Sequence, residues 1–232
     1  MGREESPRGV ALSCASRGWP IVPVTPGTTK PAVKRWDRVA TTDGDKILRW
    51  WSGSYRTCGV AVVTDPRSGL VVLRVLRWEG GEAALMELLD VHGELPRSVR
   101  ALNGAGVYEL YFGVPTVPEG REIWSTFLGG HPGLDIQAKF GYVIVPPTEH
   151  PSGRKSEWVD GCAPWEVDVA PVPEWMFDLI YRRTDPPWLG RDDLRLKCLP
   201  EIEMQAILGV ACSTSAPIEA LWSSVRKGGR AT

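Results

Sequence analysis

The spacing of apolar residues predicts four helices in the first 181 residues of the chain. They span residues 10–17, 40–51, 81–92 and 171–181. Gly18 and Gly93 directly follow the first and the third segment, where a glycine commonly ends a helix. In the second segment, Thr42 or Asp43 can accept hydrogen bonds from the amides of the first turn. The fourth segment is expected to close over a sheet.

Short runs rich in β-branched and aromatic residues lie between these helices and predict strands. They are residues 19–24, 58–64, 70–76, 99–102, 107–112, 134–137 and 142–145. Prolines in the first run indicate an edge strand. Only turn residues separate 58–64 from 70–76, so we expect these two strands to be adjacent and paired. The turn 103–106 predicts a hairpin. This order of helices and paired strands favours an α+β fold over a doubly wound parallel sheet.

A change in composition at Asp185, which two prolines and a tryptophan follow, predicts a domain boundary. We therefore expect one domain over residues 1–184 and a linker with a helical tail over residues 185–232. The tail has two short helical patterns within 200–226. These helices either dock on the domain or bind a protein partner, since Trp222 on an amphipathic helix is a typical anchor.

Composition limits the choice of compartment and partner. The chain has 232 residues, a formal net charge of -1 and a pI near 6.3, so any contact with nucleic acid must come from a local patch. Its five cysteines are scattered and lack zinc-site spacing, which favours reduced thiols. No apolar run reaches the roughly 18 residues of a membrane span, and the N-terminus lacks a signal-peptide pattern. We expect a cytoplasmic protein that does not contact a membrane.

A local basic patch is present near the start of the chain. Lys30, Lys34, Arg35 and Arg38 lie close together in sequence, with Trp36 among them. Cations and an aromatic ring are the groups that bind a phosphate backbone and a base. The alternative is a solvated loop whose tryptophan folds back onto the core.

Short motifs recur in a characteristic order between residues 10 and 181. They include Arg17-Gly18-Trp19-Pro20, Lys30-Pro31, Trp50-Trp51, Gly69-Leu70-Val71-Val72, Leu110-Tyr111-Phe112, Leu134-Asp135-Ile136, Gly141-Tyr142-Val143 and Pro146-Pro147-Thr148. In order and spacing, this set resembles the N-terminal domain of bifunctional DNA primase/polymerases (Prim-Pol), a family of the archaeo-eukaryotic primase superfamily. The resemblance implies a four-stranded RRM-like catalytic sheet beside a smaller α/β unit, with a nucleotide held between them.

The chain departs from the family at the residues that handle metal and nucleotide. In the strand 70–76, the family has two aspartates two residues apart, which share one face and hold a divalent cation. Arg74 and Leu76 stand at these positions. Glu109 stands where the family has a histidine that contacts the incoming triphosphate. Asp135 is the only family acid that the chain retains.

These replacements suggest a charge substitution. If Arg74, Glu109 and Asp135 share one sheet face, the guanidinium lies about where metal would lie and can pair with both acids. The alternative is that Arg74 extends into solvent. Glu79 and Glu82, just past the strand, are candidates for displaced metal ligands.

No other catalytic constellation is visible in the sequence. There is no Walker loop, nucleophile elbow or zinc-protease motif, and His92, His131 and His150 offer no substitute catalyst. The turn 103–106 is either a hairpin turn or, through its glycines, a place where backbone can approach a phosphate.

Three functions follow from the resemblance and the replaced residues. The first is an inactive Prim-Pol-like module that needs no cofactor and binds nucleotide or DNA through Lys30, Lys34 and Arg35, or acts in regulation. The second is an active DNA primase/polymerase with relocated ligands for Mg²⁺ or Mn²⁺. The third is a protein interaction module that acts through the helices of 200–226.

Overall fold

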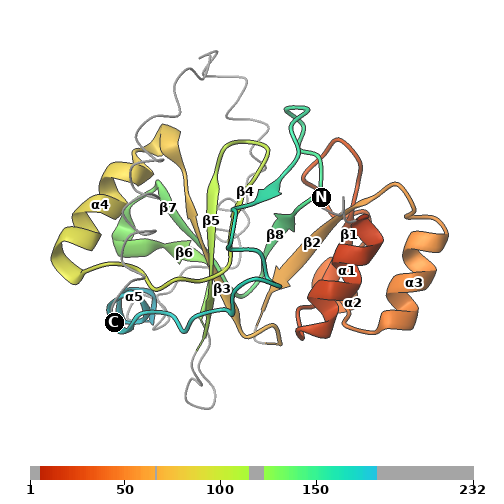
Figure 1. Cartoon of the computed structure of the whole chain (residues 1–232), viewed down its shortest axis with the longest axis horizontal. Coiled ribbons are helices and arrows are strands. Elements are labelled where there is room, and N and C mark those ends of the chain that lie inside the picture. Colours follow the sequence, from red (N-terminus) through yellow and green to blue (C-terminus); the bar gives the residue numbers. More distant parts are fainter. Residues whose placement is uncertain (1–5, 66, 115–122, 182–232) are drawn as a thin grey trace. The chain divides into compact units, whose positions relative to one another are not determined.

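The structure is a computed structural model, and it describes residues 6–65, 67–114 and 123–181 (Figure 1). The described residues form helices and two sheets, and every pairing between named strands is antiparallel. The fold is thus mixed α+β, as the sequence predicts. No helix among these residues is long and apolar enough to cross a membrane. The predictions for 185–232, including the two helices within 200–226, lie outside the described residues.

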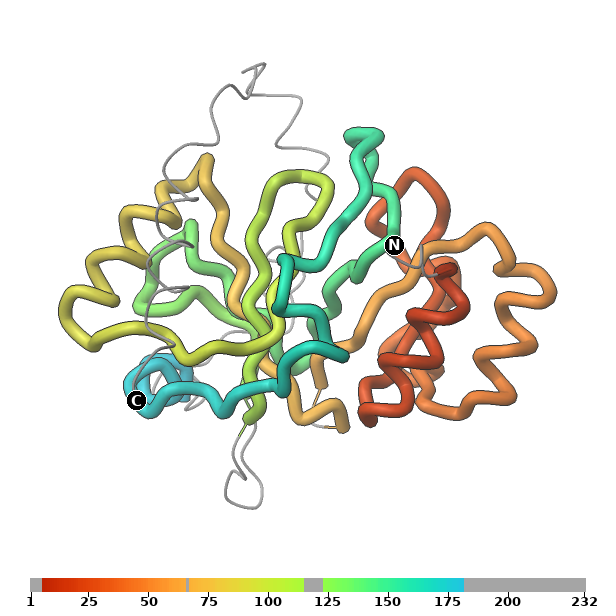
Figure 2. The backbone as a smooth tube through the Cα atoms, in the orientation of Figure 1, coloured from red at the N-terminus to blue at the C-terminus, as the bar shows by residue number. Residues whose placement is uncertain are grey.

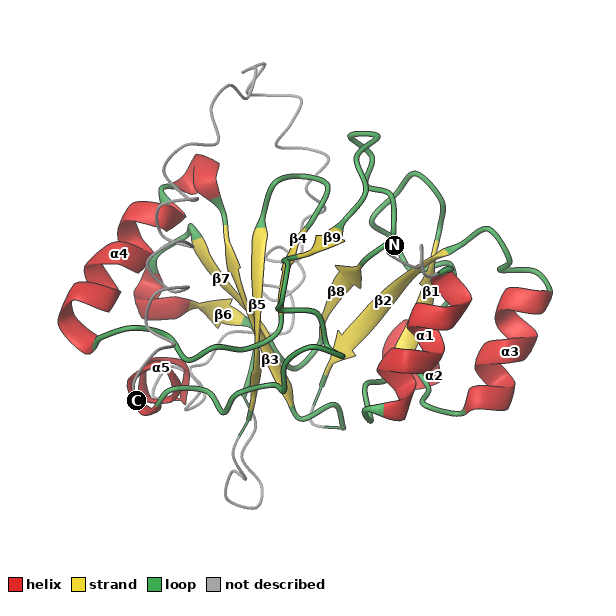
Figure 3. Ribbon diagram, in the orientation of Figure 1, coloured by secondary structure: helices red, strands yellow, loops and turns green. Residues whose placement is uncertain are grey.

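One sheet has three strands in the order β1-β2-β8. The strands are β1 (Ile21–Val24), β2 (Gly59–Thr64) and β8 (Gly141–Val145). The proline-containing strand β1 is an edge strand, as predicted. Helices α1 (Pro7–Ser16) and α3 (Gly44–Ser52) pack on one face of this sheet (Figure 3), and Asp43 caps α3 by accepting from the amides of Asp45 and Lys46.

The alternation of side chains along β1 and β2 separates the two faces of this sheet. Ile21 and Val62 belong to the core shared with α1 and α3, whereas Val22 and Val63 lie on the opposite face. The short helix α2 (Trp36–Val39) covers that opposite face through its tryptophan. Both faces of the sheet are therefore buried.

The other sheet has six strands in the order β6-β7-β3-β5-β4-β9. The strands are β3 (Leu70–Val75), β4 (Arg100–Leu102), β5 (Tyr108–Gly113), β6 (Thr126–Phe127), β7 (Leu134–Gln137) and β9 (Glu157–Trp158). The predicted hairpin is present as β4 and β5. The resemblance implies four strands, and the structure adds the two-residue strands β6 and β9 at the edges. Two residues are too few to show a period in the sequence.

The remaining helical elements accompany the six-stranded sheet. They are α4 (Gly81–His92), α5 (Glu174–Tyr181) and the 3₁₀ turns η1 (Arg77–Glu79) and η2 (Leu128–Gly130). Helix α4 has the predicted bounds and ends at Gly93, whose φ of 85° suits a glycine. Ala84 and Leu85 of α4 are buried, as are Met176 and Ile180 of α5.

The expected pairing of the strands at 58–64 and 70–76 is wrong. Strand β2 hydrogen-bonds to β1 and β8, and β3 hydrogen-bonds to β5 and β7, so both edges of each strand are occupied by other partners. Figure 2 shows the backbone passing from one sheet to the other between these two strands. The turn residues near Gly69 therefore mark a crossing between sheets.

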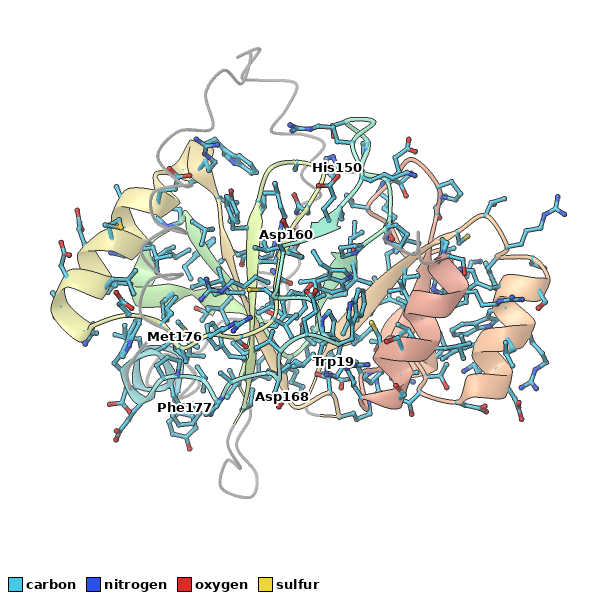
Figure 4. All side chains as sticks on the ribbon, in the orientation of Figure 1. Trp19, His150, Asp160, Asp168, Met176 and Phe177 are labelled. Atoms are coloured by element: carbon cyan, nitrogen blue, oxygen red, sulfur yellow. The ribbon has the colours of Figure 1, made fainter. Side chains whose placement is uncertain are left out.

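A common core joins the two sheets. Val60 and Val62 of β2 belong to the same buried cluster as Val72 of β3 and Tyr111 of β5. Trp19, labelled in Figure 4, stacks on Tyr111 with ring centroids 6.0 Å apart. The face of β3 and β5 that carries Val72 and Tyr111 thus faces the interior between the sheets.

Candidate functional site

Arg74 is flanked by an acidic residue on each neighbouring strand. The antiparallel registers align Arg74 with Glu109 of β5 and with Asp135 of β7. Directly opposed residues on adjacent strands share a sheet face, with their Cβ atoms about 4.5–5.5 Å apart. The register of the sheet therefore brings together three of the residues that the sequence singled out.

The ion pairs expected from the sequence are present. Nη1 of Arg74 lies 3.1 Å from Oδ2 of Asp135, and its Nε lies 3.9 Å from Oε1 of Glu109. The Arg74 side chain is only 16% exposed, and that of Glu109 only 2%. The alternative, in which Arg74 extends into solvent, is therefore wrong. Charges this far from water interact strongly because solvent screens them little.

Two polar side chains donate hydrogen bonds to the carboxylate of Glu109, in addition to its ion pair with Arg74. Asn103 donates its Nδ2 hydrogen to Oε1 at 3.2 Å, and Tyr111 donates its hydroxyl to Oε2 at 3.2 Å. Oδ1 of Asn103 also accepts from the amides of Ala105 and Val107, so the same residue fixes the turn between β4 and β5. Both oxygens of Glu109 thus have a donor inside the protein, which offsets the cost of burying the carboxylate.

Tyr111 is a fully buried member of this network. Burial raises the pKa of its hydroxyl well above the usual value, and the nearby charge of Glu109 raises it further. Tyr111 therefore keeps its proton at neutral pH and remains a donor to Glu109. On the other acid, Gln137 donates to Oδ2 of Asp135 at 2.7 Å.

Three further members of this network, Asn103, Tyr111 and Gln137, are not predicted from the sequence. Gln137 carried a usable signal, because it lies two residues after Asp135 on a strand and so shares its face. Asn103 was interpreted as a turn residue and Tyr111 as part of an apolar strand. Both interpretations hold, and each side chain also contacts Glu109.

Leu76 lies outside the strand in which the sequence places it. The amide of Leu76 still donates to the carbonyl of Gly133 beside β7, but strand β3 ends at Val75 because the carbonyl of Leu76 accepts from the amides of Glu79 and Gly81 in the following turn. Leu76 thus begins the turn η1, is buried, and carries no side-chain oxygen.

A catalytic divalent cation, which the family resemblance implies, does not fit these residues. The donors near the site are the carboxylates of Glu109 and Asp135, and the guanidinium of Arg74 already contacts both. Glu82, one of the two candidates for a displaced ligand, pairs with Nε of Arg77 at 2.7 Å. Across residues 6–65, 67–114 and 123–181, no three His, Cys, Asp or Glu side chains come together in a way that could hold a metal ion.

The basic residues expected to contact phosphate are at the surface. Lys30, Lys34 and Arg35 are all exposed, and they lie in the loop that leads into α2. Trp36 is half-buried, with its ring edge against Tyr142 at a centroid distance of 5.0 Å. The tryptophan thus folds back onto the three-stranded sheet, as the alternative interpretation expects, while the cations beside it face solvent.

The turn after β4 is packed against another loop of the chain. The carbonyl of Gly104 accepts from Oγ of Ser152 at 2.7 Å and from Nε of Arg154 at 2.9 Å. A Cβ at position 104 would collide with the backbone of Arg154 and with the buried His150, which Figure 4 labels. Nδ1 of His150 accepts from the amide of Ser152. These contacts favour the hairpin-turn interpretation over phosphate binding.

Comparison with known proteins identifies one family. No curated protein matches the chain. The sequence profile described as "Bifunctional DNA primase/polymerase, N-terminal" (Prim-Pol) matches residues 11–175, which is more than half of the 232-residue chain and includes Arg74, Glu109 and Asp135. The chain therefore belongs to the Prim-Pol family.

Proposed function

We propose that this chain is a Prim-Pol domain without metal-dependent nucleotidyl transfer, and that it acts as a nucleotide-binding, nucleic-acid-binding or regulatory module. The observation that carries the proposal is the pair of contacts from Arg74 to Glu109 and Asp135. According to the resemblance, the family has a metal-binding aspartate of the RRM-like sheet at the position of Arg74. A side-chain cation takes the place of a bound cation.

Electrostatics explains why the two cations exclude each other. Two unit charges 4 Å apart interact by about 4 kcal/mol at an effective dielectric constant of 20. A divalent ion beside the guanidinium would meet about twice that repulsion, and it would have to share carboxylates that Arg74 already engages. Asp135 alone supplies too few oxygens to organise the metal ions of a polymerase.

Binding of nucleotide or nucleic acid is supported by the family and by the surface. Lys30, Lys34 and Arg35 are exposed in one short loop, where they are accessible to phosphates. Such contacts are independent of sequence and weaken as salt concentration rises. The net charge of -1 adds no long-range attraction, so affinity depends on this loop.

A paired experiment tests both parts of the proposal. Primer synthesis and primer extension are measured with Mg²⁺ and with Mn²⁺, beside a titration of nucleotide and single-stranded DNA by fluorescence anisotropy. We expect no product with either metal and salt-dependent binding of DNA. Product formation that the Asp135→Asn variant abolishes would establish the active-enzyme alternative. Absence of all binding at low salt would contradict the proposal that the chain binds nucleotide or nucleic acid.

A further inference from the structure

A small cavity lies at the end of the three-stranded sheet, next to α2. Its volume is about 170 Å³. The lining residues are Trp36, Asp37, Val63, Asp65, Arg67, Lys139 and Phe140. They come from α2, from the end of β2 and the turn after it, and from the segment that leads into β8, and none of them is Arg74 or one of its partners.

One wall of the cavity is an aromatic residue held in an uncommon conformation. Phe140 has a φ of 62° and its side chain is 49% exposed. A bulky residue in the left-handed region is strained, and such strain persists where the surroundings fix it and often marks functional sites. Nζ of Lys139 lies 5.2 Å from the centroid of this ring and 4.5 Å from that of Trp124. An ammonium group and an aromatic face thus meet at the cavity.

The opposite wall is fixed by contacts within the protein. Trp36 packs edge-on against Tyr142, whose hydroxyl donates to the carbonyl of Thr29 at 3.1 Å. Arg67 pairs with Asp65 and donates to the carbonyl of Asp37 at 2.7 Å. These contacts connect α2 to the end of β2, so the cavity is formed before any ligand arrives.

The lining indicates the chemistry of the occupant. Aromatic rings from Trp36 and Phe140, with polar groups at the margin, suit a planar ring that has a polar edge. A volume of about 170 Å³ lies below the roughly 300–1,000 Å³ of pockets that hold a whole drug-sized ligand. The occupant is therefore a single ring system and not a complete nucleotide. Lys34 and Arg35 directly precede Trp36 and are exposed, which adds cations at the rim for the groups attached to that ring.

We infer that this cavity receives one unpaired base of a single-stranded nucleic acid, and that Lys34 and Arg35 contact the phosphates beside it. The inference rests on the proposed nucleic-acid binding and assigns the site of that binding. A base within a duplex is stacked on both sides and cannot enter, so single strands are selected. Stacking on one aromatic side chain contributes about 5- to 150-fold in affinity.

Fluorescence anisotropy with matched oligonucleotides tests the inference. Phe140→Asn removes the ring and keeps a residue type that tolerates the left-handed region. We expect it to weaken binding of a base-bearing single strand about fivefold or more, with no effect on an abasic strand of equal length. Trp165→Asn is the control, because Trp165 is 47% exposed and its ring packs on Trp158 instead. This variant should change neither affinity.

Different results would contradict the proposed nucleic-acid binding and the assignment of that binding to the cavity. If the unaltered protein binds neither strand at low salt, the proposed nucleic-acid binding fails. If it binds both strands and Phe140→Asn does not weaken binding of the base-bearing strand, only the inference about the cavity fails. Deoxyribose and ribose versions of the same strand distinguish DNA from RNA as the source of the base. A free nucleoside monophosphate that competes as strongly as the strand would overturn the role of the neighbouring phosphates.

Photocrosslinking provides a test that does not depend on the stability of a variant. A single strand that carries 5-iodouracil is irradiated with the unaltered protein, and the crosslinked tryptic peptides are identified by mass spectrometry. We expect a crosslink in the peptide 140–154, which begins with Phe140. Crosslinks confined to peptides without a residue of the cavity would contradict the inference.

Discussion

Nη1 of Arg74 lies 3.1 Å from Oδ2 of Asp135, on a strand directly opposite in the sheet. This contact joins Arg74, which we propose replaces an aspartate of the family, to Asp135, which we propose is the family acid that the chain retains. Because Glu109 lies on the other side of Arg74 in register, one guanidinium serves two carboxylates. The side chains at positions 74 and 109 are thus opposite in charge, and each offsets the cost of burying the other inside the fold.

Replacing Arg74 by alanine should destabilise the protein strongly. The change leaves Glu109 and Asp135 without their shared counter-charge, and breaking a buried pair in this way typically costs about 3–5 kcal/mol. The free energy of unfolding in urea measures the effect. Arg56→Ala is the matched control, since Arg56 is exposed and should change stability by less than about 0.5 kcal/mol. Equal effects of the two variants would show that the ion pairs contribute little.

Introducing the residues that the resemblance assigns to the family at positions 74, 76 and 109 should create a metal-binding face. In the variant Arg74→Asp, Leu76→Asp and Glu109→His, the guanidinium is absent and new ligands lie near Asp135. We expect Mn²⁺ or Mg²⁺ to raise the melting temperature of this variant and not of the parent. Metal at about a hundred times its dissociation constant would add about 2.7 kcal/mol of stability.

A fourth substitution identifies the ligand in that experiment. Adding Asp135→Asn to the triple variant should remove most of the shift caused by metal, because it removes the carboxylate from which the site is rebuilt. A shift of equal size with asparagine at position 135 would show that the metal binds elsewhere. An unresponsive triple variant would show that the position of Leu76, beyond the end of β3, prevents a shared face.

We expect the protein to lose stability at alkaline pH because of the raised pKa of the buried Tyr111. Burial and the charge of Glu109 raise the pKa of its hydroxyl in the folded protein, whereas the pKa of an unfolded tyrosine is about 10. Above that pH, the folded state binds more protons than the unfolded state, so stability falls as pH rises. Tyr111→Phe should flatten this slope by up to about 1.4 kcal/mol per pH unit.

The control for Tyr111 is a tyrosine outside the network. Tyr55 lies after α3, where its ring meets Trp50 edge-on, so Tyr55→Phe removes a hydroxyl without touching Glu109. Unfolding free energies are compared between pH 8 and 11 in both variants, a range of about three units that includes the ordinary tyrosine pKa of about 10. A slope that Tyr55→Phe flattens as much as Tyr111→Phe would remove Tyr111 as its source.

The sequence predicts those parts of the fold that depend on local patterns. Helix α4 and its end at Gly93 follow from apolar spacing and a glycine, and the cap of α3 follows from Asp43. The expected pairing of β2 with β3 is wrong. Each strand pairs with segments far apart in the chain, and local sequence patterns do not indicate such partners. In β2 and β8, for example, Val60 is aligned with Val145.

The same limit applies to the candidate site. Arg74, Glu109 and Asp135 are predictable from the sequence because the resemblance assigns each of them to a position in a family motif. The hydrogen bonds that Asn103 and Tyr111 donate to Glu109 could not be predicted, since they require the exact course of a turn and the burial of a ring. Sequence patterns indicate periodicity and residue type. The hydrogen-bond network around Glu109 depends on distances between side-chain atoms, which such patterns do not contain.

Replacing Lys30, Lys34 and Arg35 together by alanine should weaken binding of single-stranded nucleic acid to the same extent for unrelated sequences. Cations that contact phosphates carry no information about the bases. Each phosphate contact on a single strand contributes about 0.7 to the slope of log affinity against log salt. Loss of all three contacts should therefore lower that slope by about 2, measured by anisotropy over a range of salt concentrations.

A control with the same change in charge separates local contacts from the field of the whole protein. Arg8, Arg49 and Arg56 are also exposed and lie outside the loop that leads into α2, so their replacement by alanine removes three positive charges elsewhere. If Lys30, Lys34 and Arg35 contact phosphates directly, only their replacement lowers the slope of log affinity against log salt concentration. If both triple variants lose affinity equally, binding follows net charge, and the loop before α2 is not the phosphate site.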